Sequence, residues 1–183
     1  MTRLTVIAGP TAVGKGTVVR EILRLNPEIR LSVSVTTRPP RSDEVDGKHY
    51  FFVSEEKFDE LLAGDQLLEY ATVHKVHRYG TPKQPVLDAV NEGKQIILEI
   101  DVQGARQVKK TMPEANLIFI APPSDEELMR RLATRGTETK AEMELRLQTA
   151  KLEMAAAAEF DHIVVNHEVA QCAQEVLDLM QAS

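Results

Sequence analysis

Apolar residues gather along the chain in short β-rich runs that alternate with segments of helical spacing. Leu4–Ala8 is the first such run, and the glycine-rich turn after it leads into 17–25, where apolar residues recur at helical intervals. The segment 29–35 alternates between apolar and polar residues, which predicts a strand with one polar face. The same criteria predict further strands at 49–53, 67–73, 95–100, 116–121 and 162–166.

Helical segments separate most of these strands. Ser54 and Ser124 each stand where a side-chain oxygen caps the first turn of a helix, and Gly64 marks the end of the first of these helices. The remaining helices are predicted at 82–92, 105–110, 141–158 and from 169 onward. Because strands alternate with helices, we expect an α/β fold with a mostly parallel sheet covered by helices on both faces.

The segment 36–81 differs from the rest of the chain in composition and in the order of its predicted elements. It opens with a loop-like stretch rich in proline and charge, and continues with a strand, a helix and a strand between turn signals. This pattern predicts a small α+β insertion carried on the main domain. Further on, ATRGTETK (133–140) breaks the helical pattern between two helices and has the composition of a hinge or lid.

Composition narrows the function classes. The chain has 183 residues, enough for one domain with an excursion or two, and 43% of them are hydrophobic. Acidic residues outnumber basic ones by 28 to 22, which argues against a general nucleic-acid binder. Cys172 is the single cysteine, so no intrachain disulfide forms, and we interpret it as a small filler on an apolar helix face. No apolar run has the length of a membrane span and no secretory signal is evident, so we expect no membrane partner and a cytoplasmic location.

The turn after the first strand carries the pattern of a phosphate-binding loop. Gly9 and Gly14 are five positions apart, Lys15 follows directly, and the context is strand, turn, helix. Glycines allow backbone N–H groups to surround phosphate oxygens, and the lysine reaches the terminal phosphates of a nucleotide. The residues expected to bind the nucleotide are Gly9, Pro10, Thr11, Ala12, Val13, Gly14, Lys15, Gly16 and Thr17.

One position in this loop departs from the usual pattern. Gly16 follows Lys15, where a serine or threonine normally helps to hold Mg²⁺. Thr17 supplies a hydroxyl one residue later, and we expect it to contact the metal directly or through a bound water.

A pair of arginines at the start of the insertion suggests a second phosphate site. Arg38 and Arg41 are three residues apart on a chain stiffened by Pro39 and Pro40. Polyproline geometry has three residues per turn, so both side chains leave on the same side, about 9 Å apart at the backbone. Two guanidinium groups can then converge on one phosphate. RPPR is also an ordinary loop composition, and that interpretation stays open at this point.

Several spaced motifs together resemble one family over essentially the whole chain. They are SVSVTTRPPR, DGKHYFFVS, LLEYA, RYGTP, ILEIDVQGA, RRLATRGTET and the late VVN. In this order they resemble guanylate kinase of the bacterial type. The resemblance implies a P-loop kinase fold with a core at 1–35, 82–125 and 160–183, a GMP-binding insertion at about 36–81, and a helical lid at about 126–159.

The resemblance also assigns roles in the insertion. It implies that Arg38, Arg41, Tyr50 and Tyr79 bind the phosphate of GMP, and that Ser34, Glu69 and Thr81 bind the guanine. The chemistry agrees for Glu69, because a carboxylate accepts hydrogen bonds from both N1–H and N2–H₂ of guanine, whereas adenine offers no proton at N1. The family often has Asn-Tyr where this chain has His77-Arg78 before Tyr79; Arg78 either adds charge near the acceptor phosphate or is simply solvated.

Two carboxylates end the strand at 95–100. Glu99 and Asp101 are two residues apart, at the carboxyl edge of the sheet where open α/β folds bind ligands. By resemblance Asp101 is an active-site residue, near either the guanine or the water shell of the metal. Glu99 orients neighbouring side chains or takes a capping or turn role.

The segments around ATRGTETK hold three arginines. Arg131 and Arg135 are four residues apart on one helix face, and Arg146 lies on the following helix. Such residues are usually solvated, but phosphoryl transfer needs cations around the transferring group, so the resemblance implies a catalytic role for them together with Lys15. It also implies that Asn166 lies near the adenine of the donor, whereas His162 is interpreted as structural.

The sequence as a whole therefore predicts an enzyme. The expected reaction moves a phosphate from ATP to GMP or dGMP with Mg²⁺, in line and without a covalent intermediate, and gives ADP and GDP. A kinase for another nucleoside monophosphate is the alternative, against which Ser34, Glu69 and Thr81 count. A second alternative is a binding module for phosphorylated peptides, but such modules tend to have degraded loops and lids, whereas the loop residues are intact here.

Overall fold

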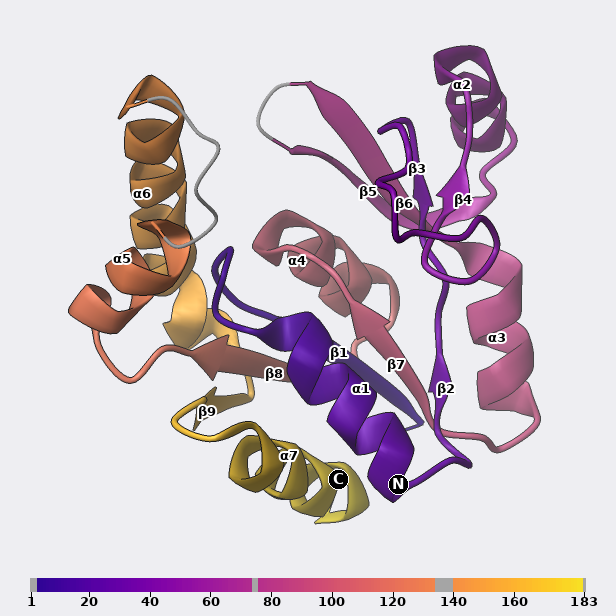
Figure 1. Cartoon of the computed structure of the whole chain (residues 1–183). Helices are drawn as coiled ribbons and strands as arrows, with labels where there is room; N and C mark the ends of the chain where they lie inside the picture. The colour runs from indigo at the N-terminus through magenta and orange to yellow at the C-terminus, as the bar shows by residue number, and fades with distance from the viewer. Residues whose placement is uncertain (1–2, 74–75, 134–139, 183) are drawn as a thin grey trace.

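The centre of the molecule is a parallel sheet. The structure is a computed structural model, and it describes residues 3–73, 76–133 and 140–182. The sheet has the strand order β2-β7-β1-β8-β9 (Figure 1), and each of these neighbours pairs in parallel. Its strands are β1 (Leu4–Ala8), β2 (Arg30–Leu31), β7 (Ile96–Glu99), β8 (Asn116–Ala121) and β9 (His162–Val165).

Helices cover both faces of this sheet, as expected for the fold class. On one face α1 (Lys15–Leu25) and α7 (Val169–Ala182) pack together, and they lie in front of the sheet in Figure 1. Alternate residues of the strands divide between the two faces: Ile7 belongs to the core under α1 and α7, and Val6 to the core on the other side. That second core contains residues of α3 (Lys83–Asn91) and α4 (Val102–Thr111). The α/β prediction is confirmed.

A second, smaller sheet stands at the carboxyl end of the first. Its strand order is β4-β3-β6-β5, and β6 pairs antiparallel with both of its neighbours. A small core of its own includes Phe58 of the helix beside it. The elements are β3 (Val35–Thr36), β4 (Phe51–Phe52), α2 (Glu55–Ala63), β5 (Leu67–Val73) and β6 (His77–Pro82).

Figure 1 shows a helical pair on the opposite side of the β1–α1 turn from the second sheet. The pair consists of α5 (Asp125–Ala133) and α6 (Lys140–Ala155), and the 3₁₀ helix η1 (Ala156–Glu159) continues the chain from α6. Leu128, Leu132 and Ala150 form the buried contact between the two helices. The long helix predicted at 141–158 thus ends earlier and gives way to a tighter turn.

One strand prediction was wrong and one strand of the second sheet was missed. The segment 29–35 is not one strand, because 30–31 pairs with β7 in the core sheet, 32–34 belongs to no strand, and 35–36 pairs in the second sheet. Apolar and polar residues do alternate over 29–35, but within this segment the chain passes from the core sheet to the second sheet. β6 was not predicted, since HRYGTP lacks an apolar alternation and owes its strand conformation to β3 and β5 on either side.

The predicted helix caps are confirmed. The Ser54 hydroxyl accepts a hydrogen bond from the Lys57 N–H at 3.2 Å, and the Ser124 hydroxyl accepts one from the Glu127 N–H at 3.2 Å. Cys172 is 1% exposed within the core under α7, as expected of a filler, and burial raises its pKa to about 11. Within the described parts of the chain, no helix is long and apolar enough to cross a membrane.

Candidate active site

The turn between β1 and α1 needs glycine at two positions. Gly9 has a φ of 147° and Gly14 a φ of 98°, both in the region that side chains disfavour. A Cβ at Gly9 would also collide with the backbone carbonyl oxygen of Ile120 on β8, and one at Gly14 would lie 2.8 Å from the Asn166 amide nitrogen. The turn therefore ends directly at the N-terminus of α1, where the helix dipole favours bound phosphate.

Lys15 lies across this turn. Its Nζ donates hydrogen bonds to the carbonyl oxygens of Gly9 at 2.5 Å and Pro10 at 3.2 Å. The ammonium charge also acts on the carboxylates of Glu99, Asp101 and Glu153, whose pKa values burial raises and Lys15 lowers. Lys15 is thus the cation that these three partly buried carboxylates share, while Arg20 also acts on Glu99 and Arg106 on Asp101.

The far side of the turn rests on β9 and α5. The buried Asn166 amide donates to the carbonyl oxygen of Val13 at 2.8 Å. Arg131 donates to the same carbonyl at 3.1 Å, and its Nε donates to Glu127 at 2.7 Å. Asn166 and Arg131 are therefore brought together beneath the loop, where both bind its backbone.

The predicted acceptor-phosphate residues meet on one side of the second sheet. The Arg38 Nε donates to the Tyr79 hydroxyl at 3.1 Å, and its guanidinium carbon lies 5.5 Å from the centre of the Tyr50 ring. Tyr50 and Tyr79 pack edge to face with ring centres 5.8 Å apart. Burial, and then the charge of Glu99, raise the pKa of Tyr50 to about 12. Tyr50 thus lines the same cleft as Glu99 and lies within reach of its charge.

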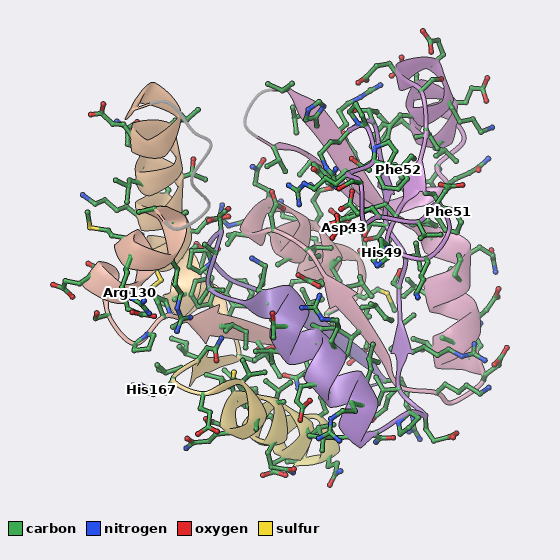
Figure 2. The ribbon with its side chains drawn as sticks, in the orientation of Figure 1. Asp43, His49, Phe51, Phe52, Arg130 and His167 are labelled. Carbon is green, nitrogen blue, oxygen red and sulfur yellow. The ribbon has the colours of Figure 1, made fainter. Side chains whose placement is uncertain are left out.

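Glu44 occupies the planar fork of Arg38. Both guanidinium nitrogens donate to its carboxylate, at 2.8 and 2.9 Å, and the Arg41 N–H donates to it at 2.8 Å. The Arg38 and Glu44 side chains are only 12% and 11% exposed, and the pair holds the pKa of Glu44 below its usual range. Arg41 itself is exposed. Figure 2 labels Asp43 and His49 on this loop, and Phe51 and Phe52 on the strand that follows.

The predicted guanine-binding residues centre on a buried carboxylate. Glu69 is 3% exposed, and its Oε1 accepts a hydrogen bond from the buried Thr81 hydroxyl at 2.6 Å. Glu69 and Thr81 are register partners across β5 and β6. Burial raises the pKa of Glu69 to about 7, with the hydroxyl opposing the rise and the charge of Asp101 adding to it. Ser34 is half-buried beside these strands.

Asp101 has a structural contact of its own. Its Oδ1 accepts a hydrogen bond from the Gly104 N–H at 2.8 Å and caps the N-terminus of α4. The capping role considered for Glu99 therefore belongs to Asp101. Glu99 is half-buried, with its carboxylate oxygen 3.5 Å from where a Cβ of Gly16 would lie.

A cleft of about 1180 Å³ runs from the turn between β1 and α1 to Glu69 on β5. Its lining includes the loop residues from Pro10 to Thr17, except Val13, and the carboxylates of Glu99, Asp101 and Glu153. It also includes Glu69 and Tyr79 of the second sheet, and Ser34, Arg41, Glu44 and Tyr50 from the segments that adjoin its strands. The cleft thus connects a phosphate-binding turn with a buried carboxylate.

Comparison with known proteins decides the family. The family model described as guanylate kinase matches residues 1–183, the whole chain. The chain belongs to the guanylate kinase family. A guanylate kinase of Leifsonia xyli subsp. xyli is 59% identical over 97% of this chain and 70% of its own length. One of Cutibacterium acnes is 55% identical over 97% of this chain and 89% of its own.

Solved structures agree with this membership of the guanylate kinase family. The crystal structure of guanylate kinase from Anaplasma phagocytophilum matches with a TM-score of 0.82 and 33% identity. The match covers 98% of this chain and 84% of that one. A shikimate kinase from Bacteroides thetaiotaomicron, with a TM-score of 0.52 and 14% identity, shares the fold alone.

Some residues that the guanylate kinase resemblance singled out are not placed by the structure. Arg135 lies outside the described residues, and so does most of ATRGTETK. Arg146 belongs to the helix α6. The roles implied for these arginines stay predictions.

The structure answers the question about Arg78. Its guanidinium donates to Asp59 at 2.7 Å and to the Glu55 carbonyl at 2.8 Å, and lies 4.5 Å from the centre of the Phe58 ring. Arg78 therefore ties β6 to α2, and is neither simply solvated nor directed at the expected phosphate site.

Glu44 and Glu153 are cleft residues that the sequence did not single out. Glu44 had no signal of its own, since Asp43 and Asp46 stand beside it in the same loop. Glu153 accepts a hydrogen bond from the Thr11 N–H at 3.3 Å, and nothing in the helical pattern of α6 marks it.

The oxygen groups near the loop fit a magnesium ion that is shared with a nucleotide. Thr17 is exposed in the first turn of α1, where its hydroxyl accepts a hydrogen bond from Arg20 at 3.1 Å. Among the residues that the structure describes, no cluster of three metal-ligating side chains forms a site by itself. Mg²⁺ usually takes one or two protein oxygens together with substrate phosphates and waters, so this donor set is adequate.

Proposed function

We propose that this protein is a guanylate kinase that transfers the γ-phosphate of ATP to GMP, giving ADP and GDP, with dGMP as a further acceptor. The observation that carries the proposal is one cleft lined both by a glycine-lysine loop and by Glu69, whose carboxylate accepts a hydrogen bond from the buried Thr81 hydroxyl. Its support is membership of the family over the whole chain. A cytoplasmic location is part of the proposal and follows from the small nucleotides it acts on.

The donor nucleotide binds at the loop. Backbone N–H groups of the 9–17 loop, to which Pro10 contributes none, surround its phosphates, and Lys15 exchanges the carbonyl oxygens that it now contacts for phosphate oxygens. Asn166 supports the loop from beneath and lies near the donor base. Mg²⁺ supplies positive charge to the phosphates when bound, and Thr17 together with Glu99 or Asp101 would hold it directly or through water.

The acceptor binds against the second sheet. Its phosphate takes the place of the Glu44 carboxylate in the fork of Arg38, with Arg41, Tyr50 and Tyr79 as further donors. Its base lies against Glu69, which accepts from N1–H and N2–H₂ in the ionised form. Ser34, Thr81 and Asp101 complete the base site.

Transfer between the two phosphates is direct and in line. The phosphate of GMP is already an anion, so the step needs no general base, and catalysis rests on positioning and on charge. Lys15 and the arginines at 131, 135 and 146 supply that charge. The arginines at 135 and 146 do so when a lid at about 126–159 closes. The insertion at about 36–81 carries the acceptor, and the core at 1–35, 82–125 and 160–183 carries the donor.

Detection of both products tests the proposal. Purified protein with ATP, Mg²⁺ and GMP is followed by phosphorus NMR, and the expected result is GDP and ADP in equal amounts. The Lys15→Met variant serves as the control and forms neither. GMP binding without any GDP would reject the kinase and favour a module that binds phosphorylated ligands.

A further inference from the structure

Helix α4 lies directly against the strand that carries Glu69. Gln107 donates from its amide to the Tyr70 carbonyl oxygen at 2.6 Å and accepts from the Tyr70 N–H at 3.1 Å. β5 is the edge strand of the second sheet, so this side chain pairs with the strand as a neighbouring strand would. The residue held by two hydrogen bonds is the direct neighbour of Glu69.

One turn earlier on the same helix, Gly104 makes room for the carboxylate. A Cβ at this position would overlap the Oε2 atom of Glu69 and would lie 3.0 Å from its Cδ. Gly104 has no positive φ, so its backbone would accept any residue. Alanine is also a better helix former than glycine. Space for the carboxylate therefore accounts for a glycine here.

The start of the helix is fixed as well. The Asp101 carboxylate caps α4 through the Gly104 N–H, which sets where Gly104 stands relative to the sheet. Asp101, Gly104 and Gln107 are spaced three apart and so follow one side of the helix. The Glu69 carboxylate is thus held between the Thr81 hydroxyl on its own sheet and the backbone of Gly104 on the core domain.

We propose that Gly104 and Gln107 are positioning residues that set the selectivity for guanine by fixing the Glu69 carboxylate from the side of α4. The inference rests on the proposed function, because it assumes that Glu69 binds the base. Neither residue touches the nucleotide in this account. A side chain at 104 displaces the carboxylate from its place, and loss of the amide at 107 lets β5 shift along the helix.

Two variants and one matched control test this inference. Gly104→Ala adds a single methyl group, Gln107→Met removes both hydrogen bonds at similar length, and Gln174→Met removes an exposed helical pair with Asp178 on α7. Calorimetry measures the binding of GMP, IMP and ATP to each, and steady-state assays give kcat and KM. Thermal unfolding confirms that each variant folds.

We expect Gly104→Ala to weaken GMP binding by about 100-fold, the loss typical of a misplacement by about 1 Å. The preference for GMP over IMP, which lacks the N2 amino group, should shrink with it, while ATP binding stays within about twofold of the parent. Gln107→Met should weaken GMP binding about tenfold, the factor that 1.4 kcal/mol of lost positioning corresponds to. Gln174→Met should match the parent.

Two results would overturn the inference. If both variants fold and bind GMP within twofold of the parent, with the GMP preference kept, α4 does not position the carboxylate. If GMP and ATP binding fall equally, the two residues act on the fold and not on the base. A parent that binds no GMP at all would remove the proposed function and this inference together, so the two failures are distinguishable.

Discussion

Replacement of Glu69 by glutamine should make the protein more stable at the same time as it damages guanine binding. The carboxylate is 3% exposed, and the structure gives it the Thr81 hydroxyl as a neutral hydrogen-bond donor. Burial raises its pKa from 4.5 to about 7, so the fold opposes ionisation of this carboxyl group. The stabilising effect of the protonated form is complete below pH 4.5 and is lost as the pH rises through 7.

The size of this effect follows from the shift in pKa. The pKa of Glu69 is about 2.5 higher in the folded protein than in the unfolded chain. Ionising the carboxylate therefore lowers the free energy of unfolding by about 3 kcal/mol. Glu69→Gln removes the charge and keeps an oxygen that accepts from Thr81. We therefore expect the variant to exceed the parent in free energy of unfolding by about 3 kcal/mol at pH 8, with the difference falling toward zero at pH 4.5.

Urea unfolding at pH 8, 6 and 4.5 measures this difference, with the exposed Glu114→Gln as a control that should show none. The same Glu69→Gln protein should show a KM for GMP raised by about 10⁴-fold, because a glutamine offers guanine an N–H where it needs an acceptor. A Glu69→Gln protein that is less stable at pH 8, or equally different from the parent at every pH, would refute the reasoning.

Four other substitutions have definite expected outcomes. Gly9→Ala should lower the free energy of unfolding by about 3 kcal/mol in urea titrations, because of backbone strain and a collision with Ile120 on the neighbouring strand β8; an unchanged midpoint would contradict the loop geometry. Glu44→Gln should lower the KM for GMP by about tenfold, because the phosphate then displaces a neutral amide and not a carboxylate from the fork of Arg38, and one charged hydrogen bond is worth about 1.5 kcal/mol; an unchanged KM in steady-state assays would contradict this competition. Lys15→Met should reduce kcat by at least about 10³-fold with the circular-dichroism melting curve intact, and substantial turnover would argue against a loop-bound donor. Arg135→Lys should lower kcat by at least about tenfold through loss of the planar fork, so an unaltered kcat would remove it from the transition state.

The sequence predicted the core of the fold well, for a physical reason. The strands at 4–8 and 116–121 are buried on both faces, so they are continuous apolar runs that carry a strong local signal. The phosphate loop carries an equally local signal, because its glycines are needed for the positive φ angles of a turn only a few residues long. The same is true of Ser54 and Ser124, whose caps lie three residues from their partners.

The second sheet was harder to predict because its partners are distant in sequence. β6 is a strand only through pairing with β3 and β5, and the crossing between sheets at 32–34 leaves no mark on an alternating pattern. The contacts of Glu69 with Thr81 and with the backbone at Gly104 also depend on the packed structure. Sequence motifs could name Glu69 by resemblance, but its burial and its raised pKa follow from the fold alone.

The most direct test of the account compares acceptors in one assay. ADP production is measured with ATP, Mg²⁺ and each of GMP, dGMP, IMP, AMP, UMP and CMP, for the parent protein and for Glu69→Gln. We expect activity with GMP and dGMP, little with IMP and none with AMP or the pyrimidines, and loss of the GMP preference in the variant. Comparable activity of the parent with GMP and AMP, or a GMP preference that survives in Glu69→Gln, would contradict the claim that this carboxylate selects the acceptor.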